Sequence, residues 1–236
     1  MSDRALFLRC GPGDVGDRAV LVGDRGRVAL AAELLTDVDR LNEDRGLATI
    51  TGTYAGRRIT VSAFGMGAPV AAVVLHELTQ LGVRSVVRLG TALAVRPALL
   101  GDLLLADAAV RGEGTSATYL PVEWPAVPDL ALRSALLSRL AAQPRPYRSG
   151  LFASYDGFYT EMFTADHTRL GHLGRYGVVG LDMETSAVFV AARALGVAAA
   201  SLCLATADAH TREFLDSRAD AEAELLEIGL ATLAGA

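Results

Sequence analysis

Ala19-Val20-Leu21-Val22-Gly23-Asp24-Arg25-Gly26-Arg27 decides the fold class of this chain, because an apolar strand runs through a glycine directly into a helical pattern. A glycine at such a turn leaves backbone N–H groups bare at the positive end of the helix dipole, where they bind anions. The guanidinium of Arg27 adds a fork of donors that matches phosphate oxygens. The stretch therefore predicts a βα unit with an oxyanion site that includes Gly23 and Arg27. Taken alone, Arg27 would first be interpreted as a solvated arginine at a helix start.

Two further arginines lie in comparable places. Arg88-Leu89-Gly90-Thr91 ends the strand-like run 83–87, and Arg45 lies in the charged loop 42–46. An arginine in a buried strand needs an anionic partner, because an unpaired buried charge is costly. We therefore expect Arg88 to contact an anion.

Length and composition narrow the class of protein. With 236 residues, of which 51% are hydrophobic, the chain can bury a core as one domain spanning 1–236. The formal net charge of −5 argues against nucleic acid or a membrane surface as a partner. Without an apolar run of about 18 residues or a basic-plus-apolar leader, a cytoplasmic protein is expected. The two cysteines, Cys10 and Cys203, do not make a disulfide framework, and no Cys/His pair has zinc spacing, so we expect no metal.

Short strand-like runs alternate with longer helical patterns along the chain. Strands are predicted at 19–22, 49–54, 59–64, 83–89, 103–110, 151–155, 178–183 and 198–206. Helices are predicted at 27–35, 69–81, 128–140, 166–173, 184–195 and 212–233. The residues Ala55-Gly56-Arg57-Arg58 between two of the strands are typical of a β-hairpin. A hairpin followed by βα units predicts a mixed sheet with helices on both faces.

Two carboxylates flank a methionine in Gly180-Leu181-Asp182-Met183-Glu184-Thr185, where a strand gives way to a helix. In a strand-like stretch, Asp182 and Glu184 point to one face. A carboxylate here can accept hydrogen bonds from two adjacent hydroxyls, as on a ribose, while the thioether of Met183 packs against the sugar. The alternative is that Glu184 is an acidic residue of the first helical turn, where the dipole favours it.

In this order, Gly-Asp-x-x-Arg, a lone arginine, Arg-x-Gly-Thr and Asp-Met-Glu-Thr resemble the nucleoside phosphorylase family, which includes uridine and purine nucleoside phosphorylases. The resemblance covers nearly the whole chain, including connecting segments such as Phe64-Gly65-Met66-Gly67. It implies an α/β fold, a three-layer α/β/α single domain around a mixed, partly barrel-like central sheet.

The resemblance also implies roles for individual residues. The phosphate ligands within one subunit would be Gly23, Arg27, Arg88 and Thr91. Arg45 would reach into the neighbouring subunit's site, so the protein would be a homo-oligomer, a dimer or a trimer of dimers. The ribose would lie against Asp182, Met183 and Glu184, and the base against Phe158 and Thr206.

The implied reaction is phosphorolysis of an N-glycosidic bond by a pentosyltransferase. Inorganic phosphate is the co-substrate, and no other cofactor is needed. Phosphate attacks C1′ of the (deoxy)ribonucleoside. Arginines would hold the phosphate so that its negative charge points toward the oxocarbenium-like sugar. Arg88, Glu184 and Asp208 are the candidate catalytic residues. The arginines argue against a hydrolytic nucleosidase, which stays an alternative together with a non-catalytic nucleoside-binding or sensing protein.

The chain departs from the family at the residues that would bind the base. Purine enzymes place a proton-donating aspartate after a serine on the last strand, and the register set by Met183, Gly196 and Cys203 puts Ala207 there. A one-residue shift would restore Asp208, although strand alternation argues against it. Asp208 is equally suited to cap the segment 209–213.

The residues that read uracil also differ. Uridine enzymes carry a Gln-x-Arg pair soon after the segment that matches Phe158-Tyr159, and neither residue occurs here in register. His167 and Arg169 are either substitutes or ordinary helix-surface residues. Leu93 replaces a family glycine and should crowd the base pocket. Because Ala207 is not an acid, the uridine type is slightly favoured.

Overall fold

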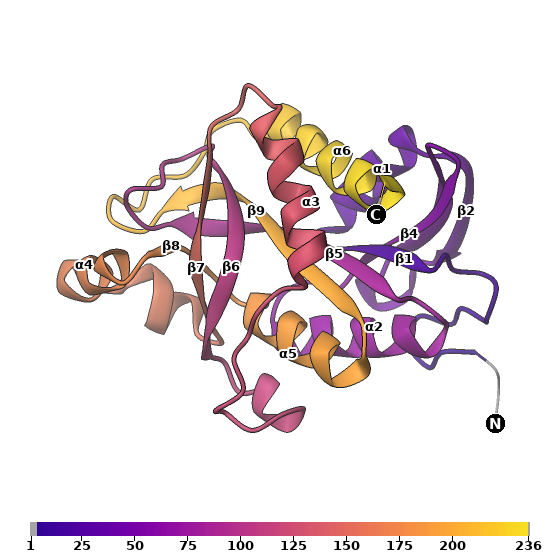
Figure 1. Cartoon of the computed structure of the whole chain (residues 1–236), viewed down its shortest axis with the longest axis horizontal. Helices are drawn as coiled ribbons and strands as arrows, with labels where there is room; N and C mark the ends of the chain where they lie inside the picture. Colours follow the sequence, from indigo (N-terminus) through magenta and orange to yellow (C-terminus); the bar gives the residue numbers. More distant parts are fainter. Residues whose placement is uncertain (1–3, 236) are drawn as a thin grey trace.

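The computed structural model describes residues 4–235, whose strands form one continuous sheet (Figure 1). The strand order is β2-β3-β4-β1-β5-β8-β7-β6-β9. The bounds of the strands are β1 Arg18–Val22, β2 Thr36–Asn42, β3 Thr49–Tyr54, β4 Arg57–Ala63, β5 Ser85–Ala94, β6 Leu103–Gly112, β7 Tyr147–Tyr155, β8 Val178–Asp182 and β9 Ala198–Asp208.

The long strand β5 belongs to both halves of this sheet. It pairs in parallel with β1 and β9, and its last residues, Leu93 and Ala94, pair with β8 in antiparallel fashion. The strands β5, β8, β7, β6 and β9 therefore close on themselves, while β2, β3, β4 and β1 extend from β5 as an open flank. Parallel and antiparallel pairs occur in both parts, so the expected mixed, partly barrel-like sheet is confirmed.

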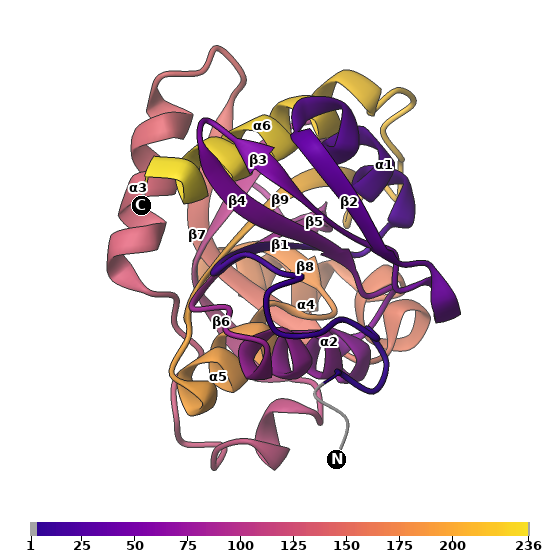
Figure 2. The same cartoon turned by 90° about the vertical axis from the view of Figure 1, so that its right-hand side faces the viewer.

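Helices cover both faces of the sheet, as predicted. Figures 1 and 2 show α2 and α5 together on one side, with α1 and α6 on the other, where α3 packs against α6. No helix within residues 4–235 is long and apolar enough to cross a membrane. The helices are α1 Arg25–Leu34, α2 Ala68–Gln80, α3 Leu130–Ala141, α4 His167–Arg175, α5 Thr185–Leu195 and α6 Ala219–Gly235, with short turns η1 Asp44–Gly46, η2 Ser116–Thr118 and the π-helical η3 Phe158–Phe163.

The side chains of β5 alternate between two apolar cores. Val86 packs in the core under α2 and α5, whereas Val87 and Leu89 pack in the core under α1, α3 and α6. This alternation follows from the two-residue period of a strand. Arg88 lies on the same face as Val86, so it interrupts the apolar face that α5 covers.

The structure differs from the predicted elements at several places, and the main differences have a physical reason. The strand predicted at 83–89 continues to Ala94, because Gly90 to Ala94 still pair with β9. The edge strand β2 was not predicted, since its exposed, polar sequence lacks the apolar alternation of a half-buried strand. The last helix begins at Ala219 rather than 212, because Ala207 bridges to Phe214 and residues 209–218 form a loop.

The predicted hairpin is present with a shorter turn. Tyr54 pairs with Arg57, so the turn consists of two residues, Ala55 and Gly56. Their φ angles are 48° and 77°, the left-handed values that a tight hairpin turn requires. The strand β4 therefore starts two residues before the predicted Ile59.

Candidate active site

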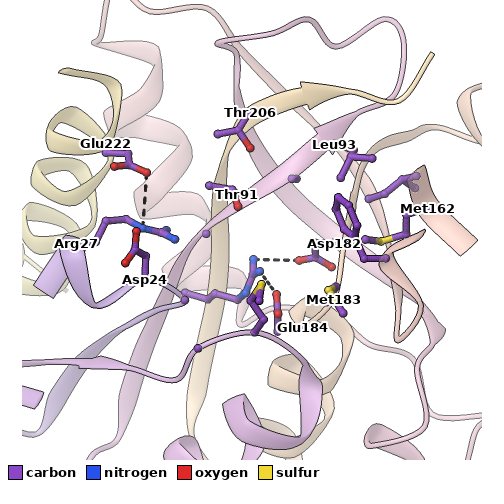
Figure 3. Close-up of a pocket in the computed structure, with 18 of the residues that line it drawn as sticks. Asp24, Arg27, Thr91, Leu93, Met162, Asp182, Met183, Glu184, Thr206 and Glu222 are labelled. Carbon is purple, nitrogen blue, oxygen red and sulfur yellow. Dashed lines mark hydrogen bonds and ion pairs between the residues drawn. The ribbon is translucent and has the colours of Figure 1, made fainter. Parts of the chain in front are cut away.

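A cavity of about 490 Å³ opens where β1 and β8 end and where α1 and α5 begin (Figure 3). β1 runs parallel to β5 and β8 runs antiparallel to it, so their carboxyl ends approach β5 from opposite directions, near Leu89 and Leu93. The lining includes every sequence-predicted site residue except Arg45 and Asp208, namely Gly23, Arg27, Arg88, Thr91, Phe158, Asp182, Met183, Glu184 and Thr206.

The turn after β1 forms one end of the cavity. The Asp24 side chain caps α1, where its Oδ1 accepts a hydrogen bond from the Gly26 N–H at 2.8 Å. A Cβ on Gly23 would lie 2.9 Å from the Gly65 carbonyl oxygen and 3.6 Å from Nη2 of Arg27, so only glycine fits. Arg27 is 4% exposed and donates from Nη1 to the Leu89 carbonyl oxygen at 2.6 Å. Arg27 is therefore not a solvated surface residue.

Arg88 lies beside this turn because β1 and β5 pair, with Val22 opposite Leu89. Its side chain is 2% exposed and forms ion pairs with Glu184 and, at 3.0 Å, with Oδ2 of Asp182. The guanidinium folds back over Gly90, where a Cβ would come within 2.5 Å of Nη1. The anionic partners of Arg88 are thus the carboxylates of Asp182, the last residue of β8, and of Glu184, which follows the strand.

The electrostatics of Arg88 are those of a compensated buried cation. Burial lowers the pKa of its guanidinium, but the Cys203 sulfur and the two carboxylates outweigh burial and place that pKa above the ordinary arginine value. Nη1 also approaches Cys203 Sγ at 2.8 Å, whereas Nε is buried with no hydrogen-bond partner within residues 4–235. Burial raises the pKa of the Cys203 thiol, and the neighbouring Arg88 guanidinium partly offsets that rise.

Asp182 and Glu184 share Arg88 but differ in what else they bind. Asp182 accepts hydrogen bonds from the Ser154 hydroxyl at 2.6 Å and from the N–H and hydroxyl of Thr185 at 3.2 and 2.5 Å. Glu184 accepts from the Gly67 N–H at 2.6 Å and makes no capping bond to α5. Glu184 is the N-cap residue of α5, but its carboxylate is held by Gly67 and Arg88 rather than by the N–H groups of the helix.

The opposite end of the cavity is apolar. Leu93, Met162 and Leu181 line it together with Phe158, which stacks on Phe163 at 5.6 Å between ring centroids. Leu93, the residue in place of the family glycine, does occupy this wall. Figure 3 shows Leu93 and Met162 on the side of the cavity away from Arg27.

Thr206 reaches the cavity through a β-bulge. The pairing of β5 with β9 runs from Ala92–Ala205 to Leu93–Ala207, so Thr206 is the extra residue. A bulge re-aims a side chain and bends its strand. Here it leaves the Thr206 side chain half-buried at the cavity wall.

Asp208 does not line the cavity, contrary to its prediction as a catalytic residue. Its Oδ1 accepts hydrogen bonds from the N–H groups of His210 and Thr211 at 2.7 and 2.9 Å, so it caps the turn after β9. His167 and Arg169 also lie outside the lining, with His167 stacked on His210 and Arg169 over the Tyr155 ring. The one-residue shift at Thr206 therefore does not bring Asp208 to the site.

Arg45 lies at the rim rather than in the lining. It is exposed in η1, with φ of 57°, and the next residue, Gly46, has φ of 75° and does line the cavity. The Arg45 guanidinium lies 5.6 Å from the centroid of the Phe7 ring. A non-glycine residue rarely adopts this left-handed conformation.

A charged pair in the lining, far from the predicted motifs, was missed by sequence reasoning. Arg218 and Glu222 come from the start of α6, where they form an ion pair at 3.5 Å. They were missed because the last helix was predicted to begin at 212, which placed both residues inside the helix rather than at its start. The available signal was Glu222 on the same helix face as Leu225 and Leu226, since a buried face seldom carries an unpaired carboxylate.

Comparisons with known proteins agree with this geometry. A sequence model of the phosphorylase superfamily matches residues 17–234. A uridine phosphorylase of Thermococcus kodakarensis is 33% identical over 88% of this chain and 78% of its own length. A guanosine phosphorylase of Halorubrum lacusprofundi is 32% identical over 91% of this chain and 87% of its own length. A purine nucleoside phosphorylase DeoD-type of Proteus mirabilis is 31% identical over 92% of each chain.

A solved structure has the same architecture. The crystal structure of a uridine phosphorylase from Vibrio fischeri superposes with a TM-score of 0.90 and 28% sequence identity, covering 99% of this chain and 98% of the other. The architecture of this chain is thus that of a known fold. This chain belongs to the phosphorylase superfamily and has the nucleoside phosphorylase fold.

Proposed function

We propose that this protein is a nucleoside phosphorylase, which transfers a pentosyl group from a base to inorganic phosphate. The products are the free base and (deoxy)ribose 1-phosphate. One observation carries the proposal: a single cavity has buried Arg27 and Arg88 at one end, Glu184 beside Arg88 and an apolar wall at the other end. This order matches the order of phosphate, sugar and base in the reacting complex.

The residues at the arginine end would hold the phosphate. Gly23, Arg27, Arg88 and Thr91 all line the cavity, and their donors would fix the dianion with its charge toward C1′. Preorganised positive groups stabilise an attacking anion without reorganising during the reaction. Arg88 contacts Glu184 directly, so the phosphate and sugar subsites adjoin.

Glu184 would hold the sugar. Its carboxylate is fixed by the Gly67 N–H and by Arg88 while it remains on the cavity wall beside Met183. It would accept hydrogen bonds from the 2′ and 3′ hydroxyls, and its charge would favour an oxocarbenium-like ring. Asp182, whose oxygens are engaged by Ser154, Thr185 and Arg88, would act by positioning Arg88.

The base end favours the uridine type. A departing purine is helped by a proton donor, and Asp208 is engaged in capping a turn outside the lining. Phe158, Leu93 and Thr206 would hold the base by packing and through one hydroxyl. Relatives named uridine phosphorylase and guanosine phosphorylase have similar identities to this chain, so the base has to be tested directly.

The test is a panel of nucleosides, each incubated with the protein with and without phosphate. We expect free base and ribose 1-phosphate only with phosphate, and higher kcat/KM for uridine than for inosine or guanosine. Equal release of base with free ribose in phosphate-free buffer would instead establish a hydrolytic nucleosidase. Binding of nucleosides without turnover in either buffer would establish a binding or sensing protein.

We further infer that the protein is a homo-oligomer, a dimer or a trimer of dimers, in which Arg45 completes a neighbouring subunit's phosphate site. The support is local: Arg45 is exposed at the tip of η1, its guanidinium is outside its own cavity, and Gly46 beside it lines that cavity. A loop at the rim of one site is well placed to cross an interface.

Subunit mixing tests this inference. Arg45→Ala and Glu184→Ala are each expected to be inactive. Mixed oligomers are expected to recover part of the activity, because some sites would contain an intact Glu184 from one subunit and an intact Arg45 from its neighbour. Activity is measured after confirming mixed oligomers by native mass spectrometry. A mixture of Arg27→Ala with Glu184→Ala, both in one subunit's cavity, should stay inactive. Mixed oligomers of the first pair that recover nothing would show that Arg45 is not shared.

A further inference from the structure

The arginine end of the cavity contains a carboxylate that the proposed reaction does not use. Glu222, in the first turn of α6, is 8% exposed and lines the cavity. Its Oε1 lies 3.9 Å from Nε of Arg27 and 3.5 Å from Nε of Arg218 (Figure 3 marks the first of these pairs). A buried carboxylate beside Arg27 is unexpected, because its negative charge would repel a phosphate bound to the same arginine.

The contacts of Arg27 show why the acid is there. Nη1 is bonded to the Leu89 carbonyl oxygen, Nη2 faces Gly23, and the buried Nε has no hydrogen-bond partner within residues 4–235. Burial lowers the pKa of the Arg27 guanidinium, and nearby Arg88 lowers it further, while Glu222 raises it. With Nη2 turned toward Gly23, the guanidinium keeps a donor for an anion while Glu222 balances its charge from the other side.

We propose that Glu222 is the resident counter-ion of the phosphate subsite and that bound phosphate competes with it for Arg27. This inference rests on the proposed function. Glu222 stabilises Arg27 while the subsite is empty, and it weakens phosphate binding because the dianion must bind beside a carboxylate. Glu222 thus sets the phosphate concentration at which the protein works.

Arg218 gives Glu222 a second partner. Its side chain is 52% exposed, it lines the cavity, and it lies one helical turn before Glu222. When phosphate takes Arg27, Glu222 keeps an ion pair with Arg218 and is not left as an unpaired buried charge, which would be costly. Glu222 can therefore give up its ion pair with Arg27 to phosphate while it keeps its ion pair with Arg218.

The decisive variant is Glu222→Gln, which keeps the shape and removes the charge. We expect phosphate, titrated by calorimetry without nucleoside, to bind about tenfold more tightly than to the unmodified protein. The KM for phosphate should fall by a similar factor. The melting temperature should be lower without phosphate but should rise more on adding phosphate, because the anion then supplies the missing counter-charge.

Glu224→Gln is the matched control. Glu224 lies on the same helix and forms an ion pair with Arg145 at 2.6 Å, but it does not line the cavity. It should leave the phosphate affinity unchanged, although it removes an equal charge from α6. If Glu222→Gln does not fold, Glu222→Ala removes the same charge, and we expect the same gain in affinity.

The outcomes separate this inference from the proposed function. If the unmodified protein binds phosphate and the Glu222 variant binds it no more tightly, Glu222 is only a structural anchor of α6 and the inference is overturned. If neither protein binds phosphate, the phosphorylase function itself fails, and the inference fails with it. Tighter phosphate binding in both the Glu222 and Glu224 variants would show that the overall charge of the protein causes the effect, and the inference would also be overturned.

Discussion

Glu184→Gln is expected to lower kcat by about 100-fold or more, because it removes the charge that favours an oxocarbenium-like sugar. Both Glu184 oxygens accept hydrogen bonds, one from the Gly67 N–H and one from Arg88. The amide NH₂ of glutamine would face one of these donors, so the sugar clamp would also lose its orientation. Steady-state kinetics with saturating phosphate measure the loss.

Glu113→Gln is the matched control for this prediction. Glu113 is also buried and accepts hydrogen bonds from the Ser116 N–H and the Ser186 hydroxyl, but it does not line the cavity. It should lower the melting temperature and leave kcat near that of the unmodified protein. Asp182→Asn should cost less turnover than Glu184→Gln. Near-normal turnover of the Glu184 variant with only a small loss of stability would show that Glu184 does not hold the sugar.

Arg88→Ala is expected to have the largest effect on stability, because it leaves Asp182 and Glu184 buried without their shared cation. Breaking one side of a buried ion pair costs roughly 3–5 kcal/mol of unfolding free energy. Loss of a charge-assisted contact to phosphate, worth about 1.5–3 kcal/mol, would weaken phosphate binding by roughly 10- to 150-fold. Urea unfolding and phosphate titration measure the two losses separately.

Arg88→Lys tests the phosphate contact if the alanine variant does not fold. Lysine keeps the positive charge for Asp182 and Glu184 but lacks the planar fork that binds two oxygens at once. We expect its phosphate affinity to fall while most of the stability is retained. Phosphate affinity equal to that of the unmodified protein would remove Arg88 from the proposed phosphate site.

Much of the fold followed from local patterns. The βα turn at Gly23, the hairpin at Gly56 and the buried strand that contains Arg88 depend on neighbouring residues, so periodicity and glycine positions predicted them. The edge strand β2 and the start of α6 did not follow, because pairing with β3 and the Ala207–Phe214 bridge are contacts between separate segments.

The candidate site divides in the same way. That Arg88 needs an anionic partner was decided by its sequence alone, since an arginine in an apolar strand carries a charge that burial makes costly. Which groups serve as that partner was decided by β8 ending beside β5, which brings Asp182 and Glu184 to one guanidinium. Their division of labour was not predictable, because it depends on Ser154 and Gly67 from distant elements.

The sequence by itself determined the α/β class, the glycine turn before α1 and the buried arginine, because each depends on residues adjacent along the chain. Only the tertiary structure decided that Thr206 forms a bulge, that Asp208 lies outside the cavity and that Glu222 faces Arg27. These three outcomes depend on strand register and helix docking. A shift of one residue in either changes which side chain reaches the cavity, and no local pattern records that choice.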